Sequence, residues 1–462
     1  MGQILSSPLK EKASESGGDN YVAYGLSCMQ GWRINMEDAH ATILDMKQVH
    51  DYRDGDEEGA NAANNNNTAA APADDGSEDH VAFFGVYDGH GGEKAAIFTG
   101  DHLHELIKAT DAYKTGDYIN ALKEGFLSCD QAILRDFFMR DDDSGCAATS
   151  ALITASKVVC GNAGDSRTIM SINGYAKALS YDHKPSNEGE KARICSAGGY
   201  VDMGRVNGNL ALSRGIGDFE FKKNVNLPPE EQIVTCYPDV IQHEINYAND
   251  EFVVLACDGI WDCLTSQNCV ECVRRGIYER KSLVEICEEL MELCCAPNSG
   301  GSGIGCDNMS VVIVALLDHA HGETLEQWYD KIIARVELAE KGDKKYGGIS
   351  APYGELYKQM YGDGYEIGQQ GSSKSGRRDS DMHDPEMEEE GLGDVAGSPI
   401  TLQKLLQSNA ITNENGVIYL DTSSAQSLLA HFGMSDEVTG DDDDTEKVEE
   451  VADEDAPTKA DE

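Results

Sequence analysis

Apolar residues gather in short runs along this chain, and most of these runs lie before about residue 320. Runs rich in Val, Ile and aromatic residues, with turn-forming residues at their ends, are typical of buried β-strands. The sequence predicts strands at residues 21–30, 41–46, 83–87, 147–155, 157–160, 166–172, 233–245, 251–257 and 309–317. The pair Asn173-Gly174, which lies between two polar-flanked apolar runs, predicts a hairpin turn.

Other stretches repeat apolar residues every three or four positions, which is the period of an amphipathic helix. Residues 118–138 and 283–295 show it most clearly. The predicted helices are 93–108, 118–138, 187–197, 266–278, 283–295 and 324–342. The predicted strands come in short meanders and the helices in pairs, with few strand–helix–strand alternations. This order favours an α+β fold, in which helices cover antiparallel sheets, over a doubly wound parallel sheet.

Two stretches lack the apolar residues that a core needs. Residues 51–79 are a low-complexity run of Asn, Ala, Asp and Gly, and residues 347–462 are polar and acidic. We interpret the first as a disordered insertion between two strands and the second as a largely disordered tail. Residues 402–432 hold enough Leu, Ile and Val for a short docking segment within that tail. The remaining chain divides into an N-terminal arm (1–19), one large domain (20–320) and a helical extension (321–346).

The 462 residues carry a formal charge of −46, and the tail contributes strongly to it. Residues 376–462 alone contain 24 acidic and 5 basic side chains, a net charge of −19. Such a chain repels nucleic acids and anionic lipids, so nucleic-acid binding is not expected. Divalent cations, in contrast, are attracted to it.

The 14 cysteines are scattered, and their spacing forms no zinc motif. With no secretory leader and no long apolar span, we expect reduced thiols and a cytoplasmic and nuclear location. Residues Gly2 and Ser6 match the pattern for N-myristoylation at Gly2, with a plain flexible N-terminus as the alternative. A single acyl chain would give only weak, transient membrane contact.

Isolated carboxylates adjoin several predicted strands. Asp88 follows the run at 83–87, Asp258 follows 251–257, and Asp307 precedes 309–317. No Lys or Arg stands beside them in the sequence, and a carboxylate at the edge of a core is costly unless it is paired or binds metal. Oxygen ligands suit magnesium or manganese better than zinc. The sequence therefore predicts a divalent-cation site, with an ordinary Asp-Gly turn as the alternative for Asp88.

Seven sequence blocks, in this order, resemble the metal-dependent type 2C protein serine/threonine phosphatases, the PPM family. The blocks are residues 31–40, 83–92, 161–167, 182–185, 205–218, 256–262 and 307–314. The resemblance covers roughly residues 20–317 and is strongest to the fungal members. It implies that the large domain is catalytic and that it folds as a four-layer α-β-β-α sandwich, with metals between the sheets at one edge. The glycine-rich block 205–218 is expected to form a mobile flap.

The resemblance also implies a ligand set for at least two Mg²⁺ or Mn²⁺ ions. Asp88 would bridge the two ions, and the carbonyl of Gly89 would bind one of them. Asp258 and Asp307 would bind the other ion. Glu37 would lie on the first ion, directly or through water.

Three further residues have catalytic roles implied by the resemblance. Arg33 would bind the phosphate as a fork, although an ion pair with nearby acids is an alternative. His90 would act as the general acid for the leaving oxygen, with an orienting role as its rival. Asp38 would orient waters on the metals. Asp165 and Asp262 would either hold a third, weaker ion or hydrogen-bond the ligands.

The implied activity is hydrolysis of phosphoserine and phosphothreonine in proteins by a metal-bridged water. The expected substrates are kinases of stress and checkpoint signalling, and the protein is expected to be a monomer. The alternative is a non-catalytic phosphoprotein-binding or regulatory module on the same fold. All the ligands that the resemblance implies are present, which favours the enzyme.

Overall fold

The computed structural model describes residues 4–48, 80–139, 142–300 and 303–362, together with 411–414 and 417–420. The chain divides into two compact units, Met1–Gln370 and Gly371–Glu462. In the second unit, β15 (Ile411–Glu414) and β16 (Val417–Leu420) form an antiparallel pair. The predicted insertion at 51–79 and the rest of the predicted docking segment at 402–432 lie outside the described residues.

Six antiparallel strands form the first sheet of unit one, in the order β1-β2-β14-β13-β7-β8. They are β1 (Ile4–Gly18), β2 (Val22–Arg33), β14 (Met309–Leu316), β13 (Asp250–Ala256), β7 (Arg167–Ile172) and β8 (Tyr175–Ala178). The predicted hairpin turn joins β7 to β8, and its two residues, Asn173 and Gly174, have φ angles of 52° and 85°. Positive φ at both positions is what a type I′ turn requires.

The second sheet has the order β12-β6-β5-β4-β3, and β11 pairs with β5 beside this path. Its strands are β12 (Asp239–Glu244), β6 (Lys157–Ala163), β5 (Gly145–Thr154), β4 (Val81–His90), β3 (Ala39–Ile43) and β11 (Ile216–Gly217). The strand predicted at 233–245 is therefore shorter than expected. Its first residues leave the sheet because Val234 is buried in a separate small cluster with Ile194 and Phe221.

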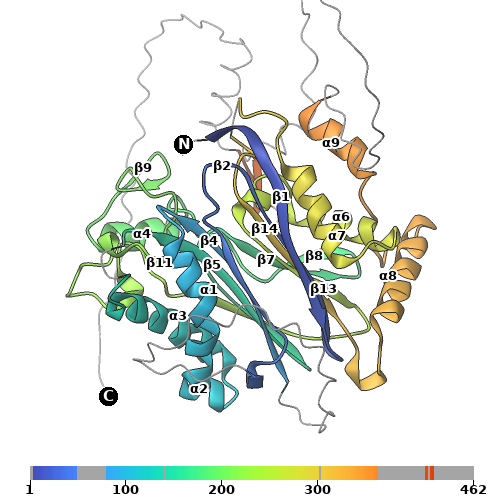
Figure 1. The fold of residues 1–462 in the computed structure, drawn as a ribbon, viewed down its shortest axis with the longest axis horizontal. Helices are drawn as coiled ribbons and strands as arrows, with labels where there is room; N and C mark the ends of the chain where they lie inside the picture. Colours follow the sequence, from blue (N-terminus) through green and yellow to red (C-terminus); the bar gives the residue numbers. More distant parts are fainter. Residues whose placement is uncertain are drawn as a thin grey trace, which may run out of the picture. The chain divides into compact units, whose positions relative to one another are not determined.

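Helices cover the outer face of each sheet (Figure 1). The first sheet is covered by α5 (Asp258–Trp261), α6 (Ser266–Tyr278), α7 (Leu283–Cys294), α8 (Leu325–Glu340) and α9 (Tyr353–Tyr361). The second is covered by α1 (Lys94–Ala109), α2 (Asp111–Lys114) and α3 (Tyr118–Arg135). Short 3₁₀ turns occur at η1 (Met46–Gln48) and η4 (His319–His321).

Successive side chains of the central strands point to opposite faces of the sheet. One set packs under the helices and forms an outer core, and the other packs between the sheets and forms the inner core. On β14, Val311 and Ile313 pack with the covering helices, whereas Val312 and Val314 pack between the sheets. There they join Phe84 of β4, in the second sheet. These alternating faces confirm the predicted α-β-β-α sandwich.

A small lobe, residues 187–236, extends from the second sheet and is called the flap lobe below. It contains α4 (Glu188–Ser196), β9 (Val201–Asp202), β10 (Arg205–Val206), β11, η2 (Phe219–Phe221) and η3 (Pro229–Glu231). Glu190 of α4 is buried and forms ion pairs with Arg193 and Arg214 at 2.8 and 2.7 Å. The predicted flap at 205–218 lies within this lobe.

Residues 4–19 do not form a separate arm, which corrects the domain organisation inferred from sequence for the segment 1–19. Its strand β1 pairs with β2 at the edge of the first sheet. Lys10 and Lys12 of β1 both donate to Glu292 of α7, at 2.8 and 2.6 Å. The sequence did not reveal this strand because none of its residues is fully buried, so it has no apolar alternation.

Packing of the first unit also continues beyond residue 346, so the predicted start of the tail at 347 is too early. Tyr357 of α9 is only 2% exposed, and its hydroxyl donates to the carbonyl of Cys295 at 3.2 Å. The hydroxyl of Tyr353 donates to the carbonyl of Cys272 at 2.6 Å. Because α9 is short and buries a single residue, its sequence carries little helical signal.

A chain that ends at residue 362 should melt at the same temperature as the full chain, whereas one that ends at 346 should melt lower. Replacing a buried aromatic residue by Ala typically costs about 3–5 kcal/mol. Tyr357→Ala in the full chain should therefore reproduce much of the loss, and Gln359→Ala, which is exposed on the same helix, should not. Thermal melting monitored by circular dichroism measures these differences. Equal melting of the two truncated chains would contradict a structural role for α9.

No helix in the described part of the chain has both the length and the apolar character to cross a bilayer. Each of the 14 cysteines is a free thiol, and most of them are buried.

Candidate metal centre and active site

Strand β4 carries Asp88, Gly89 and His90 to one rim of the sandwich. Its pairing with β5 continues to the last residue, where His90 lies opposite Gly145. Asp88-Gly89 is therefore not the turn that was considered as an alternative. A side chain at position 89 would overlap with the carbonyl oxygen of Glu37, so glycine is required because the two backbones touch.

The first sheet brings two further carboxylates to the same rim. Asp258 opens helix α5 immediately after β13, and its amide nitrogen lies 3.4 Å from Oδ2 of Asp88. Asp307 lies just before β14, where Gly31 of β2 has a φ of 65° and contacts its carbonyl too closely for any side chain. The two sheets thus contribute jointly to one acidic rim.

Two groups of side chains at this rim have the spacing of metal ligands. Carboxylate oxygens of Asp88, Asp165 and Asp258 lie within 4.8 Å of one another, and so do ligand atoms of Asp38, Asp88 and Cys257. One oxygen of Asp38 accepts a hydrogen bond from Ser310 at 2.7 Å, whereas the other is buried and has no hydrogen-bond partner. An unsatisfied buried oxygen among carboxylates fits a hard divalent cation.

The electrostatics of the rim support the same conclusion. Burial raises the pKa of Asp88 and of Asp258 well above the usual range, and the neighbouring carboxylates raise both further. Burial likewise raises the pKa of Asp38, to about 7. Crowded anions disfavour one another's charged forms, and a cation bound among them would reverse this effect.

Arg33, the last residue of β2, lies at the same rim. Its Nη2 donates to Oδ2 of Asp307 at 2.5 Å. The ion pair that was the alternative to phosphate binding by Arg33 is thus present. Its partner, however, is Asp307 rather than Glu37 or Asp38. Because a guanidinium has five N–H donors, this contact leaves others available for a phosphate group.

His90 is held by a residue that the sequence reasoning missed. Its Nε2 lies 2.8 and 2.9 Å from the two carboxylate oxygens of Asp218. Burial alone would lower the pKa of His90, but the charge and hydrogen bond of Asp218 raise it. Asp218 has a φ of 53° and lies directly over Gly145, where any side chain would overlap with its carboxylate. The only sequence signal was the pair Gly217-Asp218 within the predicted flap.

Asp165 and Asp262 differ in their positions. Asp165 belongs to the carboxylate cluster and also forms an ion pair with Lys184. Asp262 follows α5, and its amide donates to the carbonyl of Asp258 at 2.8 Å. Burial raises the pKa of Asp262, but its side chain does not line the cavity described below.

Asn308 is a second functional residue that sequence reasoning missed. Its Nδ2 donates to the carbonyls of Gln30 and Asn35, at 2.8 and 3.0 Å, and its Oδ1 accepts from the amide of Glu37 at 2.9 Å. These three bonds fix the loop that carries Glu37. The only signal was its place next to a predicted metal ligand.

These side chains open into one cavity of about 680 Å³. The predicted residues that line it are Arg33, Glu37, Asp88, Gly89, His90, Asp165, Asp258 and Asp307. Flap-lobe residues also line this metal cavity, among them Arg205, Asn209 and Phe221. Asp38 is not part of the lining, although one of its oxygens lies within 4.8 Å of Asp88.

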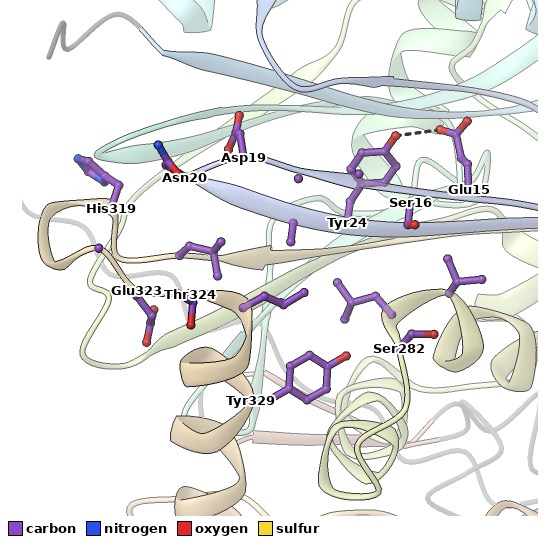
Figure 2. A pocket seen from close by; sticks show the side chains of 18 of the residues that line it. Glu15, Ser16, Asp19, Asn20, Tyr24, Ser282, His319, Glu323, Thr324 and Tyr329 are labelled. Atoms are coloured by element: carbon purple, nitrogen blue, oxygen red, sulfur yellow. Dashed lines mark hydrogen bonds between the residues drawn. The ribbon is translucent and has the colours of Figure 1, made fainter. Parts of the chain in front are cut away.

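A larger cavity, of about 950 Å³, lies between the β1–β2 hairpin and the first residues of α7 and α8 (Figure 2). Its carboxylates already have partners. Asp19 pairs with His80 at 2.8 Å, and Glu15 accepts from Tyr24 at 3.3 Å. The volume of a cavity alone therefore does not identify the site that has the metal-binding and catalytic side chains.

The rim combines what hydrolysis of a phosphate monoester requires. It has carboxylates for cations, a guanidinium for the phosphate and an imidazole held by an acid. Fold and site together define a metal-dependent phosphatase.

Comparison with known proteins places the chain within this class. The profile described as Protein phosphatase 2C matches residues 22–303. "Protein phosphatase 2C homolog 2" of Schizosaccharomyces pombe is 51% identical over 341 residues, which cover 74% of this chain and 84% of that protein. The protein of the same name in Saccharomyces cerevisiae is 50% identical over 334 residues, covering 72% and 66%. The chain belongs to the protein phosphatase 2C family and is a Mg/Mn-dependent serine/threonine phosphatase, as the sequence motifs predicted.

A solved structure supports the fold. The crystal structure of a phosphatase from Toxoplasma gondii superposes with a TM-score of 0.51 at 24% identity, and covers 67% of this chain and 96% of that one. At this identity the likeness concerns the fold alone.

Proposed function

We propose that this enzyme hydrolyses phosphoserine and phosphothreonine in proteins and that two divalent cations, Mg²⁺ or Mn²⁺, bind at the acidic rim. The convergence of Asp88, Asp165 and Asp258 from both sheets carries this proposal. Asp88, Asp258, Asp307, Glu37 and the carbonyl of Gly89 would hold the ions. When bound, such ions neutralise charge on the phosphoryl group and lower the pKa of the water that attacks it.

The chain's own residues then perform two tasks. Arg33 binds phosphate oxygens through the N–H groups that do not contact Asp307. His90 protonates the leaving seryl or threonyl oxygen. Its Nε2 is engaged by Asp218, so the proton comes from Nδ1, and the carboxylate of Asp218 favours the charged imidazolium that this step requires.

The test of this proposal is hydrolysis of a phosphothreonine peptide with Mg²⁺ or Mn²⁺, with and without a chelator. We expect chelation to abolish turnover and excess metal to restore it. Calorimetric titration of the metal-free protein with Mn²⁺ should give at least two ions per chain. Activity that survives excess chelator would contradict the proposal.

Arg33→Ala should raise the KM for a phosphopeptide about tenfold with a smaller change in kcat, because it removes binding shared by the ground and transition states. Arg33→Lys keeps the charge but not the fork, so it should recover only part of the loss. Steady-state kinetics separates the two parameters. A fall in kcat at constant KM would mean that Arg33 contacts the phosphate only in the transition state. That result would contradict its role in substrate binding.

We further propose that its substrates are kinases of stress and checkpoint signalling and that it acts as a monomer in the cytoplasm and nucleus. This substrate class rests on the resemblance of the sequence blocks to the fungal members of the family. We also propose that Gly2 is myristoylated, which gives transient membrane contact; the pattern Gly2…Ser6 supports this modification. Mass spectrometry of the N-terminal peptide tests the modification, and activation-loop phosphothreonine in cells without the enzyme tests the substrates.

A further inference from the structure

Large apolar side chains are exposed where α3 ends and on the neighbouring flap lobe. Phe137 is 72% exposed and Phe138 82%, and their rings make an edge-on contact with centroids 5.6 Å apart. Leu134 of α3 and Val225 of the flap lobe are also exposed. We call these four residues the α3 patch. Exposed apolar side chains that gather at one place are typical of interaction sites.

A cavity of about 390 Å³ opens beside the patch, and both Leu134 and Val225 line it. Most of the remaining lining is apolar or uncharged and comes from α3 and the flap lobe; it includes Leu127, Gln131, Phe219, Leu227, Pro229 and Cys236. A pocket of this size and chemistry suits an aliphatic or aromatic side chain.

This side cavity shares a wall with the metal cavity. Within residues 218–222, Asp218, Glu220 and Phe221 line the metal cavity, whereas Phe219 and Lys222 line the side cavity. The single 3₁₀ turn η2 therefore separates the two. A helical turn with its side chains is about 10 Å thick, and an extended peptide covers that distance in about three to four residues.

The shared wall is tied to α3, which lies beside β11 in Figure 1. Asp130 of α3 is buried, and its two oxygens accept from Lys222 Nζ at 2.6 Å and from the amide of Gly217 at 2.9 Å. Lys222 also donates to the carbonyl of Gly215 at 2.8 Å. The next residue after Gly217 is Asp218, which holds His90. A group that fills the side cavity thus touches the turn that positions the proposed general acid.

We propose that the side cavity and the α3 patch bind an apolar side chain of the protein substrate, about three to four residues from the phosphorylated one. This inference rests on the proposed function. The substrate itself is the occupant because only the turn η2 separates the side cavity from the metal cavity, where the phosphorylated residue must bind. An extended chain of about three to four residues is long enough to reach from one cavity to the other.

The experiment uses the full chain with Mn²⁺ and a set of phosphothreonine peptides of one length, built on an alanine–serine background. Each peptide carries a single leucine, placed in turn from six residues before to six residues after the phosphothreonine. We expect leucine at three or four residues, on one side only, to raise kcat/KM about tenfold through a lower KM.

The double variant Phe138→Ser/Val225→Ser should lose this positional preference and hydrolyse p-nitrophenyl phosphate as the wild type does. Leu338→Ser is the matched control, since Leu338 is an exposed leucine on α8, which covers the other sheet. A flat dependence on leucine position in the wild type, or a preference that survives in the double variant, overturns the docking site. If light scattering shows that the double variant changes only the oligomeric state, the patch is a contact between copies and the inference is wrong. Failure of the wild type to hydrolyse any peptide contradicts the proposed function instead.

Discussion

The Asp88→Asn enzyme is expected to lose at least about a thousandfold in kcat/KM, because metal-assisted hydrolysis supplies several kcal/mol of transition-state stabilisation. Its fold should persist. In the metal-free state its melting temperature should even rise, since one of several buried, mutually repelling carboxylates becomes neutral. Phosphopeptide kinetics and differential scanning fluorimetry without metal measure the two effects.

Asp101→Asn is a suitable control for this experiment, because Asp101 is exposed on α1. It should leave both activity and melting unchanged. If Asp88→Asn kept more than a tenth of the wild-type activity, Asp88 would not be a central ligand.

Replacing His90 by Ala should lower kcat by about 10²–10⁴ on alkyl phosphates such as phosphothreonine, the usual contribution of general acid catalysis. Aryl phosphates should lose far less, because their leaving groups need little protonation. Asp218→Asn should show the same selectivity with a smaller loss, since it weakens the charge that favours protonated His90. The ratio of alkyl to aryl activity is the measurement. Equal losses on both substrates, for either variant, would exclude the proton-donor role for His90.

The carboxylates that meet at the rim were predictable because their signal is local. An apolar strand that ends on a lone carboxylate, as at Asp88 and Asp258, is visible within ten residues of sequence. Asp218 and Asn308 lack such a signal, because each acts on a partner far away in the chain, His90 in one case and Glu37 in the other. Their roles follow from tertiary contacts alone.

The helices and strands divide in the same way into those that the sequence predicts and those that it does not. Strands with one or two buried faces, such as β13 and β14, stand out as apolar runs. Strand β1 and helix α9 do not, since they lie at the periphery and bury little. Peripheral elements are stabilised by a few specific contacts, such as those of Lys10 and Tyr357, rather than by a repeating pattern.

The pairing of β2 with β14 has a consequence for biosynthesis. Leu26 of β2 lies opposite Val312 of β14, roughly 290 positions later in the chain. At a translation rate of about 5–20 residues per second, β2 waits roughly 15–60 seconds for this neighbour to be made. During that interval one row of its backbone hydrogen-bonding groups, and the apolar side chains that pack against β14, lack these native partners. Nascent chains of this enzyme should therefore depend on chaperones until Asp307 and β14 leave the ribosome, which is also the moment when the proposed metal site becomes complete.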